Sequence, residues 1–276
     1  MSKHSKWVAL ALAVAMLATA GLMAGCSSST PKTTGTTGTT PEKATVKTVT
    51  AGSLIVGSDT AFPPFESMNG TVAEGFDVDI ADAIAKDLGL KMEFKSYKFD
   101  TLIPTLKAGG KFDIIMSGMT INADRRKEID FSSAYIDSNQ SISVKNDSTV
   151  KAAADLAGKR IGVQSGTTGQ QWAKENIPTA VLVPFDDTLA AFSALQAGKV
   201  DAVVNDLPVS AAVVKDAARG LKIVQEIPTG EQYGIAVAKT NPELLKAVNG
   251  ALVKLKSDGT YDTIYKKWFG VAPSSK

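Results

Sequence analysis

Residue types that can do chemistry are unevenly placed in this 276-residue chain. Its single Cys and single His, Cys26 and His4, both lie near the N-terminus. The remainder therefore has no thiolate nucleophile, no imidazole base and no His or Cys ligand for a metal, which excludes Ser-His-Asp hydrolysis, Cys-His proteolysis and a zinc site. Carboxylates, hydroxyls, Lys and Arg remain, and we expect no catalytic residue, no metal and no cofactor.

Arg125 is a candidate for binding a carboxylate. It follows the apolar strand pattern of residues 113–116, and ligands of open α/β sheets lie beyond the carboxyl ends of strands. A carboxylate prefers a guanidinium that donates two hydrogen bonds, together with backbone donors at a helix start. The residues alone leave an alternative open, in which Arg125 is a surface residue paired with Asp124 or Glu128.

Asp206 is the matching candidate for binding an ammonium. It directly follows the apolar pattern of residues 202–204, and a desolvated ammonium requires a paired acid. Asp206 could instead cap the helix that Pro208 helps to start. Thr167 and Thr168 lie in a Gly-containing turn between a strand and a helix, where they offer backbone amides to an anion or simply cap the helix.

Apolar strand patterns alternate with helical ones, which predicts parallel or mixed α/β sheets. The strands are more numerous than one small sheet needs, so we expect two α/β lobes. Ile80 and Ile84 indicate one helix that Gly89 ends, and Asp100 is a candidate N-cap for the next. Strands are expected at residues 54–56, 91–95, 113–116, 160–163, 180–183 and 202–204, and helical structure at residues 241–269.

The N-terminus has the layout of a secretory signal. Lys3 and Lys6 precede an uncharged apolar run over residues 7–25. Residues 22–26, Leu-Met-Ala-Gly-Cys, resemble the bacterial lipobox, in which the Cys is lipidated and the preceding peptide removed. We therefore expect residues 1–25 to be a signal peptide and Cys26 to carry a lipid; the alternative is an uncleaved signal anchor.

Removal of that peptide changes the charge balance. Lys3 and Lys6 are lost without any acid, so the 30 basic residues fall to 28 against 28 acidic residues and the net charge becomes zero. Nucleic-acid binding normally requires a basic excess, so we expect no nucleic-acid partner. Residues 26–51 start at the lipidated Cys and are rich in Thr, which predicts a flexible tether of roughly 25–30 Å.

Six segments together resemble the bacterial solute-binding proteins for polar amino acids that serve ABC importers. In chain order they are residues 57–66, 75–79, 124–132, 162–169, 201–208 and 258–270. The resemblance implies a type II periplasmic-binding-protein-like fold with two lobes, a ligand in the cleft and two crossovers near residues 135–141 and 229–233. Lobe 1 would comprise residues 52–135 and 234–276, and lobe 2 residues 140–230.

The same resemblance assigns roles within the cleft. It implies that Arg125 binds the α-carboxylate and that Asp206 binds the α-ammonium. Asp59, Phe62 and Phe99 match the side-chain pocket. The remaining expected ligand-binding residues are Ser117, Gly118, Thr120, Gln164, Thr167 and Thr168. Glu66 and Glu74 are expected to be solvated surface acids.

The expected ligand is a polar or cationic L-amino acid: glutamine, arginine, lysine or histidine. Glutamine-binding relatives often carry Lys at the position of Gln164 and His at that of Asn205, so these two residues favour the cationic ligands. The expected partners are a free L-amino acid, an ABC-transporter permease and the membrane, through the lipid anchor. We expect an extracytoplasmic monomer on the outer or periplasmic side of the cell membrane.

Three other functions are open at this point. A dehydratase of the cyclohexadienyl or arogenate type, on the same fold, would keep the carboxylate clamp and add a general acid. The sensor domain of a receptor would need a transmembrane helix after the binding domain, and no apolar run of the length of a membrane span follows Cys26. A structural surface lipoprotein would not need a clamp.

Overall fold

The computed structural model describes residues 46–273. The predicted signal peptide, Cys26 and the tether up to residue 45 lie outside these residues. The last part of the predicted tether, residues 46–51, makes hydrogen bonds to later parts of the chain. The backbone N–H of Val49 donates to Asp113 at 2.6 Å, and Asn241 Nδ2 donates to the carbonyl of Lys47 at 3.0 Å.

The first sheet is mixed and has the strand order β5-β1-β6-β13-β7. β1 is buried along its whole length and pairs in parallel with β5 and β6, while β13 pairs antiparallel with β6 and β7. The strands are β1 (Ser53–Ser58), β5 (Lys91–Ser96), β6 (Ile114–Ile115), β7 (Asp130–Phe131) and β13 (Ala236–Val237). A small antiparallel sheet follows β1 and contains β2 (Ala61–Phe62), β3 (Glu66–Asn69) and β4 (Val72–Glu74).

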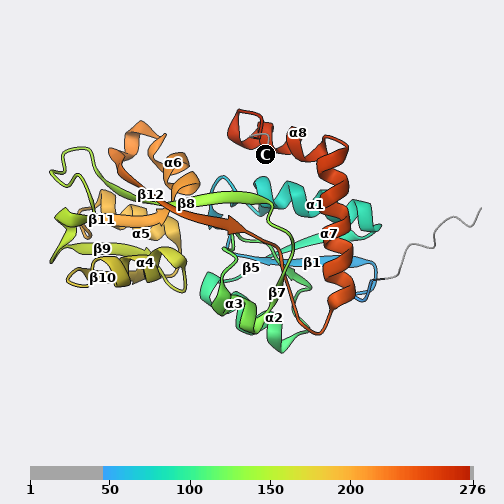
Figure 1. Ribbon diagram of the computed structural model, residues 1–276. Helices are drawn as coiled ribbons and strands as arrows, with labels where there is room; N and C mark the ends of the chain where they lie inside the picture. Colours follow the sequence, from blue (N-terminus) through green and yellow to red (C-terminus); the bar gives the residue numbers. More distant parts are fainter. Residues whose placement is uncertain (1–45, 274–276) are drawn as a thin grey trace, which may run out of the picture. The chain divides into compact units, whose positions relative to one another are not determined.

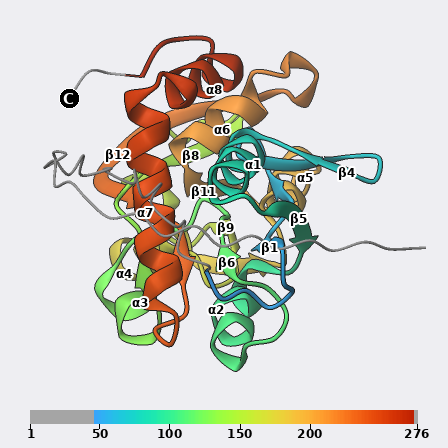
Figure 2. The ribbon, with the colours of Figure 1, turned by 90° about the vertical axis from the view of Figure 1, so that its right-hand side faces the viewer.

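Helices cover both faces of the first sheet. α1, α7 and α8 lie on one face and α2 and α3 on the other (Figures 1 and 2). Side chains alternate along β1, so Leu54 and Val56 pack in the core under α1 and α7, whereas Ile55 packs with Leu102 of α2. The bounds are α1 (Phe76–Leu88), α2 (Phe99–Ala108), α3 (Ala123–Glu128), α7 (Pro242–Ser257) and α8 (Thr260–Phe269).

The sequence signals for helix ends are confirmed in one case and corrected in two. Gly89 ends α1 in the left-handed conformation with φ 71°, as predicted. The prediction that Asp100 caps α2 is wrong, because the cap is Lys98, two residues earlier, and Asp100 lies in the first turn. The predicted C-terminal helical stretch is two helices, separated at Gly259, whose φ of 81° no helix can accommodate.

The second sheet has the order β10-β9-β11-β8-β12. β9 pairs in parallel with β10 and β11, whereas β8 pairs antiparallel with β11 and β12. Its strands are β8 (Ile136–Lys145), β9 (Arg160–Gln164), β10 (Val181–Phe185), β11 (Ala202–Asp206) and β12 (Leu221–Tyr233). Its helices are α4 (Thr168–Asn176), α5 (Thr188–Gln196), α6 (Leu207–Val214) and the 3₁₀ turns η1 (Ala153–Leu156) and η2 (Ala217–Arg219). The two mixed α/β sheets confirm the predicted fold class.

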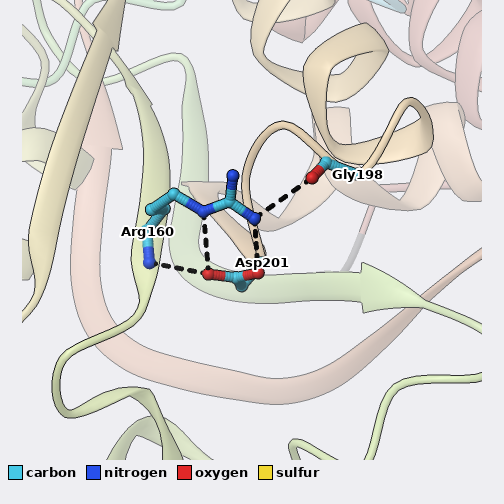
Figure 3. A network of polar contacts seen from close by, with 3 residues as sticks. All are labelled: Arg160, Gly198 and Asp201. Atoms are coloured by element: carbon cyan, nitrogen blue, oxygen red, sulfur yellow. Dashed lines mark hydrogen bonds and ion pairs between the residues drawn. The ribbon is translucent and has the colours of Figure 1, made fainter.

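A polar network joins the starts of β9 and β11, at the end of the second sheet where both strands begin (Figure 3). The Arg160 guanidinium donates to both carboxylate oxygens of Asp201, at 3.2 and 2.9 Å, and to the carbonyl of Gly198 at 3.1 Å. The ion pair raises the pKa of Arg160 and lowers the pKa of Asp201. This network fixes the ends of β9 and β11 that lie away from Gln164 and Asp206.

Two long strands, β8 and β12, extend from the second sheet to the first (Figure 1). They contain the segments expected as crossovers, and these segments pair with each other through Glu231 opposite Ser138 and Tyr233 opposite Ile136. The residue boundaries of the two lobes stay a prediction. Within residues 46–273, no helix has both the length and the apolar character that crossing a membrane requires.

An aromatic cluster holds α1 and α8 together, and Phe76 lies at its centre. Phe76 is 0% exposed, and its ring centroid lies 6.1 Å from that of Phe65 and 5.2 Å from that of Phe269. We expect Phe76→Ala to lower the free energy of unfolding by about 3–5 kcal/mol, measured by urea denaturation. Val253→Ala on the exposed face of α7 is the control and should change it by less than about 0.5 kcal/mol. Equal effects of the two variants would contradict this packing.

Candidate functional site

The candidate site residues follow the carboxyl ends of strands in both sheets. Asp59 follows β1, and Ser117, Gly118 and Thr120 lie in the loop after β6. Gln164 is the last residue of β9 and Asp206 the last of β11. Because β1 runs parallel to β6 and β9 runs parallel to β11, the loops after these strands lie at the same edge of each sheet, as expected for a binding site on this type of fold.

These residues surround a small cavity. Its volume is about 10 Å³, which is about the space of one water molecule. Two further predicted residues adjoin the lining: Asp59 accepts a hydrogen bond from Gln164, and Ser117 directly precedes Gly118. The lining consists of Phe62, Phe99, Gly118, Thr120, Arg125, Gln164, Thr167, Thr168 and Asp206, all of which belong to the predicted site.

Arg125 is oriented into the cavity by its short helix. Asn122 caps α3 by accepting from the backbone N–H of Arg125 at 2.8 Å. The guanidinium donates to the carbonyl of Thr120 at 2.7 Å and to the carbonyl of Gly166 at 3.1 Å, so it joins loops after strands of the two sheets. It also lies 5.3 Å from the centre of the Phe99 ring.

The alternative surface role of Arg125 is not observed. Asp124 pairs with Lys127 at 2.6 Å, and Glu128 pairs with Lys107. Arg125 is only 9% exposed, and among residues 46–273 no carboxylate lies within 4.0 Å of its guanidinium. Burial lowers its pKa, while the charges of Asp206 and Glu231 oppose that shift. The result is a buried cation whose direct partners are neutral carbonyls.

Asp206 faces the same cavity. It occupies the N-cap position of α6, but its side chain caps no backbone N–H there. Its carboxylate instead accepts from Gln140 Nε2 at 2.5 Å and from the hydroxyl of Tyr233. Burial raises the pKa of Asp206 to about 7, and the nearby charge of Glu231 adds to the shift. The alternative role of Asp206 as a side-chain cap is therefore not observed.

The two threonines at the start of α4 have different roles. Thr167 is the N-cap: its hydroxyl accepts from the backbone N–H of Gln170 at 3.1 Å and donates to the carbonyl of Gln164 at 2.8 Å. The hydroxyl of Thr168 is directed toward the crossover strands and donates to Glu231 at 2.7 Å. Capping therefore accounts for the Thr167 side chain but not for that of Thr168.

Asp59 and Gln164 form the other end of the site. Gln164 Nε2 donates to Asp59, and Gln164 Oε1 accepts from the Thr188 hydroxyl at 2.8 Å. Burial raises the pKa of Asp59 to about 6; the hydrogen bond from Gln164 opposes this shift, and the negative charges of Asp187 and Asp100 add to it. This end of the cavity therefore has an excess of negative charge.

Glu66 is not the surface acid that the sequence suggested. It is 0% exposed, and burial together with the charge of Asp77 raises its pKa well above the usual range. The Ser117 hydroxyl donates to Glu66 at 3.0 Å and accepts from the backbone N–H of Asp59 at 2.9 Å. Asp77 accepts from the backbone N–H of Gly118 at 3.0 Å. The buried acids therefore fix the loop after β6 from behind; Glu74 is exposed, as predicted.

Gly118 is required where this loop meets the cavity. Its φ is +51°, in the left-handed region, and a Cβ there would lie 2.6 Å from the Phe62 ring. A side chain would therefore strain the backbone and push Phe62 out of place.

Sequence reasoning missed three polar residues in the crossover strands. Gln140 lies in β8, and Glu231 and Tyr233 lie in β12. Glu231 accepts from the hydroxyls of Thr120 at 2.8 Å and Thr168 at 2.7 Å, and Gln140 donates to both Asp206 and Glu231. Their position within the two segments expected as crossovers was the available signal, because crossovers border the cleft.

Comparisons with known proteins identify the family. The chain matches the bacterial extracellular solute-binding proteins, family 3, over residues 54–271, and it belongs to that family. A putative ABC transporter arginine-binding protein 2 of Escherichia coli (strain K12) is 38% identical over 224 residues, which are 79% of this chain and 91% of the relative.

Two solved structures have the same fold. An ancestral arginine-binding protein bound to glutamine is 47% identical, with a TM-score of 0.77, over 80% of this chain and 100% of its own. An ancestral amino acid-binding protein, a precursor of cyclohexadienyl dehydratase, is 43% identical, with a TM-score of 0.74, over 79% of this chain and 96% of its own.

The raised pKa of Asp206 predicts a pH dependence of stability. A carboxyl whose pKa is higher in the folded state than in the unfolded state stabilises the fold below its unfolded pKa of about 3.8, and this contribution is lost as pH rises to about 7. Between pH 4 and pH 8, the free energy of unfolding should therefore fall less in the Asp206→Asn variant than in the unmodified chain. Urea denaturation at a series of pH values measures this difference.

Asp201→Asn is the matched control for this measurement. Arg160 lowers the pKa of Asp201, so Asp201 titrates below this pH range. The Asp201→Asn variant should therefore show the same change in the free energy of unfolding as the unmodified chain. An unaltered pH dependence in Asp206→Asn would contradict the assignment of Asp206 as a group that titrates near neutrality.

Proposed function

We propose that this protein binds a polar or cationic L-amino acid, with arginine preferred over lysine, histidine and glutamine, and delivers it to an ABC-transporter permease. The observation that carries the proposal is the buried Arg125 guanidinium, which lines the cavity and has only backbone carbonyls as direct hydrogen-bond partners. A carboxylate is the ligand group that pairs best with such a cation, because it accepts two parallel charge-assisted hydrogen bonds.

The head group of the amino acid fits the charges around Arg125. Its α-carboxylate would bind Arg125 and the hydroxyls of Thr120 and Thr168, which lie 3.5 Å apart and come from loops of the two sheets. Its α-ammonium would bind Asp206, whose carboxylate is already oriented by Gln140 and Tyr233. A zwitterion therefore satisfies a buried cation and a buried acid together, which lowers the cost of burying each.

The Asp59 end of the cavity favours a cationic side chain. Asp59 lies within the electrostatic influence of Asp187 and Asp100, whereas the nearby Lys98 is paired with Asp186 at 2.6 Å. A guanidinium there would pair with Asp59 and stack on Phe62 or Phe99. The neutral amide of glutamine can accept and donate hydrogen bonds at Asp59 and Gln164 but gains no charge pairing.

Delivery follows from closure of the two lobes on the ligand. A ligand shifts the balance between open and closed forms only by binding the closed form more tightly, and a nearly complete shift requires about 5.5 kcal/mol. The permease would bind the closed form. We propose that the lipid on Cys26 keeps the protein on the extracytoplasmic face of the membrane, and that it acts as a monomer.

Removal of the guanidinium tests the carboxylate assignment. Arg125→Ala should weaken L-arginine binding by about 2–5 kcal/mol, because the ligand carboxylate would be buried without a partner. Isothermal titration calorimetry measures this loss, which corresponds to roughly 30-fold or more. Arg126→Ala is the matched control. Arg126 is the neighbour of Arg125 on α3 and is exposed, so removal of its side chain should leave the affinity unchanged. A loss of less than about tenfold in Arg125→Ala would refute the assignment.

Neutralisation of Asp59 tests the preference for a cation. Asp59→Asn should weaken binding of L-arginine by about tenfold or more, whereas L-glutamine, which has no side-chain charge, should be little affected. The same titrations in Asp82→Asn, a half-buried acid of α1 that pairs with Lys86 outside the cavity lining, provide the control. Equal losses for both ligands would contradict a charge pair between Asp59 and the ligand.

A dehydratase is the second candidate function. One observation favours it: the pKa of Asp206 is about 7, near the value at which a general acid works best at neutral pH. The hydrogen bonds that Gln140 and Tyr233 donate to this carboxylate oppose the role, because they stabilise its anionic form. Incubation with prephenate and with arogenate, followed by product analysis, separates the two functions, since turnover of either compound would contradict a role in binding alone.

A further inference from the structure

The carboxylate of Glu231 contacts the two threonine hydroxyls that, in the proposed function, bind the α-carboxylate of the ligand. One oxygen of Glu231 accepts from the Thr120 hydroxyl at 2.8 Å and from the Thr168 hydroxyl at 2.7 Å. Thr120 belongs to the loop after β6, Thr168 to the start of α4, and Glu231 to the crossover strand β12. A single carboxylate therefore joins groups that are carried by both sheets.

The backbone around Glu231 is fixed in position. The pairing of β12 with β8 is interrupted between Ile227 and Glu231, and Gly230 has a φ of +65°. On either side of Glu231, Gly230 N–H donates to Asn139 at 3.1 Å, and the carbonyl of Gln232 accepts from Ile121 N–H at 2.8 Å. The Glu231 side chain comes directly after this irregularity and lies against Thr120 and Thr168.

The hydroxyls cannot serve two carboxylates at once. A threonine hydroxyl has one proton to donate, and both hydroxyls already donate to Glu231. Gln140 Nε2 also lies 3.3 Å from both carboxylate oxygens of Glu231. A ligand carboxylate that binds Arg125 and these hydroxyls must therefore displace Glu231, and it meets the repulsion of a second anion until it does so.

We propose that Glu231 is an internal competitor of the ligand's α-carboxylate: it occupies the carboxylate-binding hydroxyls, raises the closed fraction of the protein before an amino acid binds, and lowers the affinity for every amino acid alike. This inference rests on the proposed function. Glu231 acts on the group that all amino acids share, so it sets affinity, whereas Asp59 acts on the side chain and sets selectivity.

Titrations of variants test the competition. In Glu231→Ala, both L-arginine and L-glutamine should bind about tenfold more tightly than in the unmodified full chain, because two hydrogen bonds to an anion no longer compete. Glu231→Gln keeps the shape but loses the charge, and it should give a smaller gain. Glu243→Ala is the control, since Glu243 is an exposed acid in the first turn of α7, outside the cavity lining and outside β12. Unchanged or weaker binding of both ligands in Glu231→Ala would overturn the proposal.

A second measurement needs no ligand. Dyes attached through Lys111→Cys and Lys199→Cys, both exposed and each on a different lobe, report the distance between the lobes by fluorescence energy transfer in a Cys26→Ser background. Without added amino acid, transfer should be lower in Glu231→Ala than in the Glu231 protein, because the lobes separate. Equal transfer would overturn the closing role. If the unmodified chain bound no amino acid, the proposed function would fail while this measurement would still decide the role of Glu231.

Discussion

The structure depends on keeping one cation, the Arg125 guanidinium, buried between two sheets. Burial of an unpaired charge is costly, and removing one partner of a buried pair costs several kcal/mol. Here the direct partners are the carbonyls of Thr120 and Gly166, and the compensating negative charges of Asp206 and Glu231 lie further away. The loop after β6, the cap of α3 and the start of α4 all have the positions that this arrangement requires.

The same constraint connects the fold to its proposed action. Arg125 and Thr120 follow β6 of the first sheet, whereas Gly166, Thr168 and Asp206 lie at or after the ends of β9 and β11 of the second. Contacts across the cleft are therefore contacts between groups that an amino acid would also use. The balance between closure by the protein's own side chains and closure around a ligand depends on small differences between charge-assisted hydrogen bonds, each of which contributes about 1.5–3 kcal/mol. In the proposed function, affinity is set where the head group binds and selectivity is set at Asp59.

Apolar strand patterns predicted the sheets and the places of Arg125 and Asp206, whereas the resemblance to the family implied most of the cavity lining. Buried parallel strands have short apolar runs, so residues 54–56, 160–163 and 202–204 were recognisable, and the residues after them line the cavity. Contacts that depend on long-range pairing were not predictable. Glu66 is buried because the β3 segment turns it toward Asp77, and no local pattern distinguishes it from the exposed Glu74. Glu231 contacts two residues of the cavity lining, Thr120 and Thr168, from a crossover strand, and the pattern of apolar residues does not encode such a contact.

The most direct test of the central claim is a crystal structure of the protein grown with L-arginine. We expect the α-carboxylate of the ligand to accept two hydrogen bonds from Arg125, with the α-ammonium on Asp206 and the ligand guanidinium near Asp59. Arginine bound with its carboxylate away from Arg125, or bound outside the cavity between the two sheets, would contradict the account.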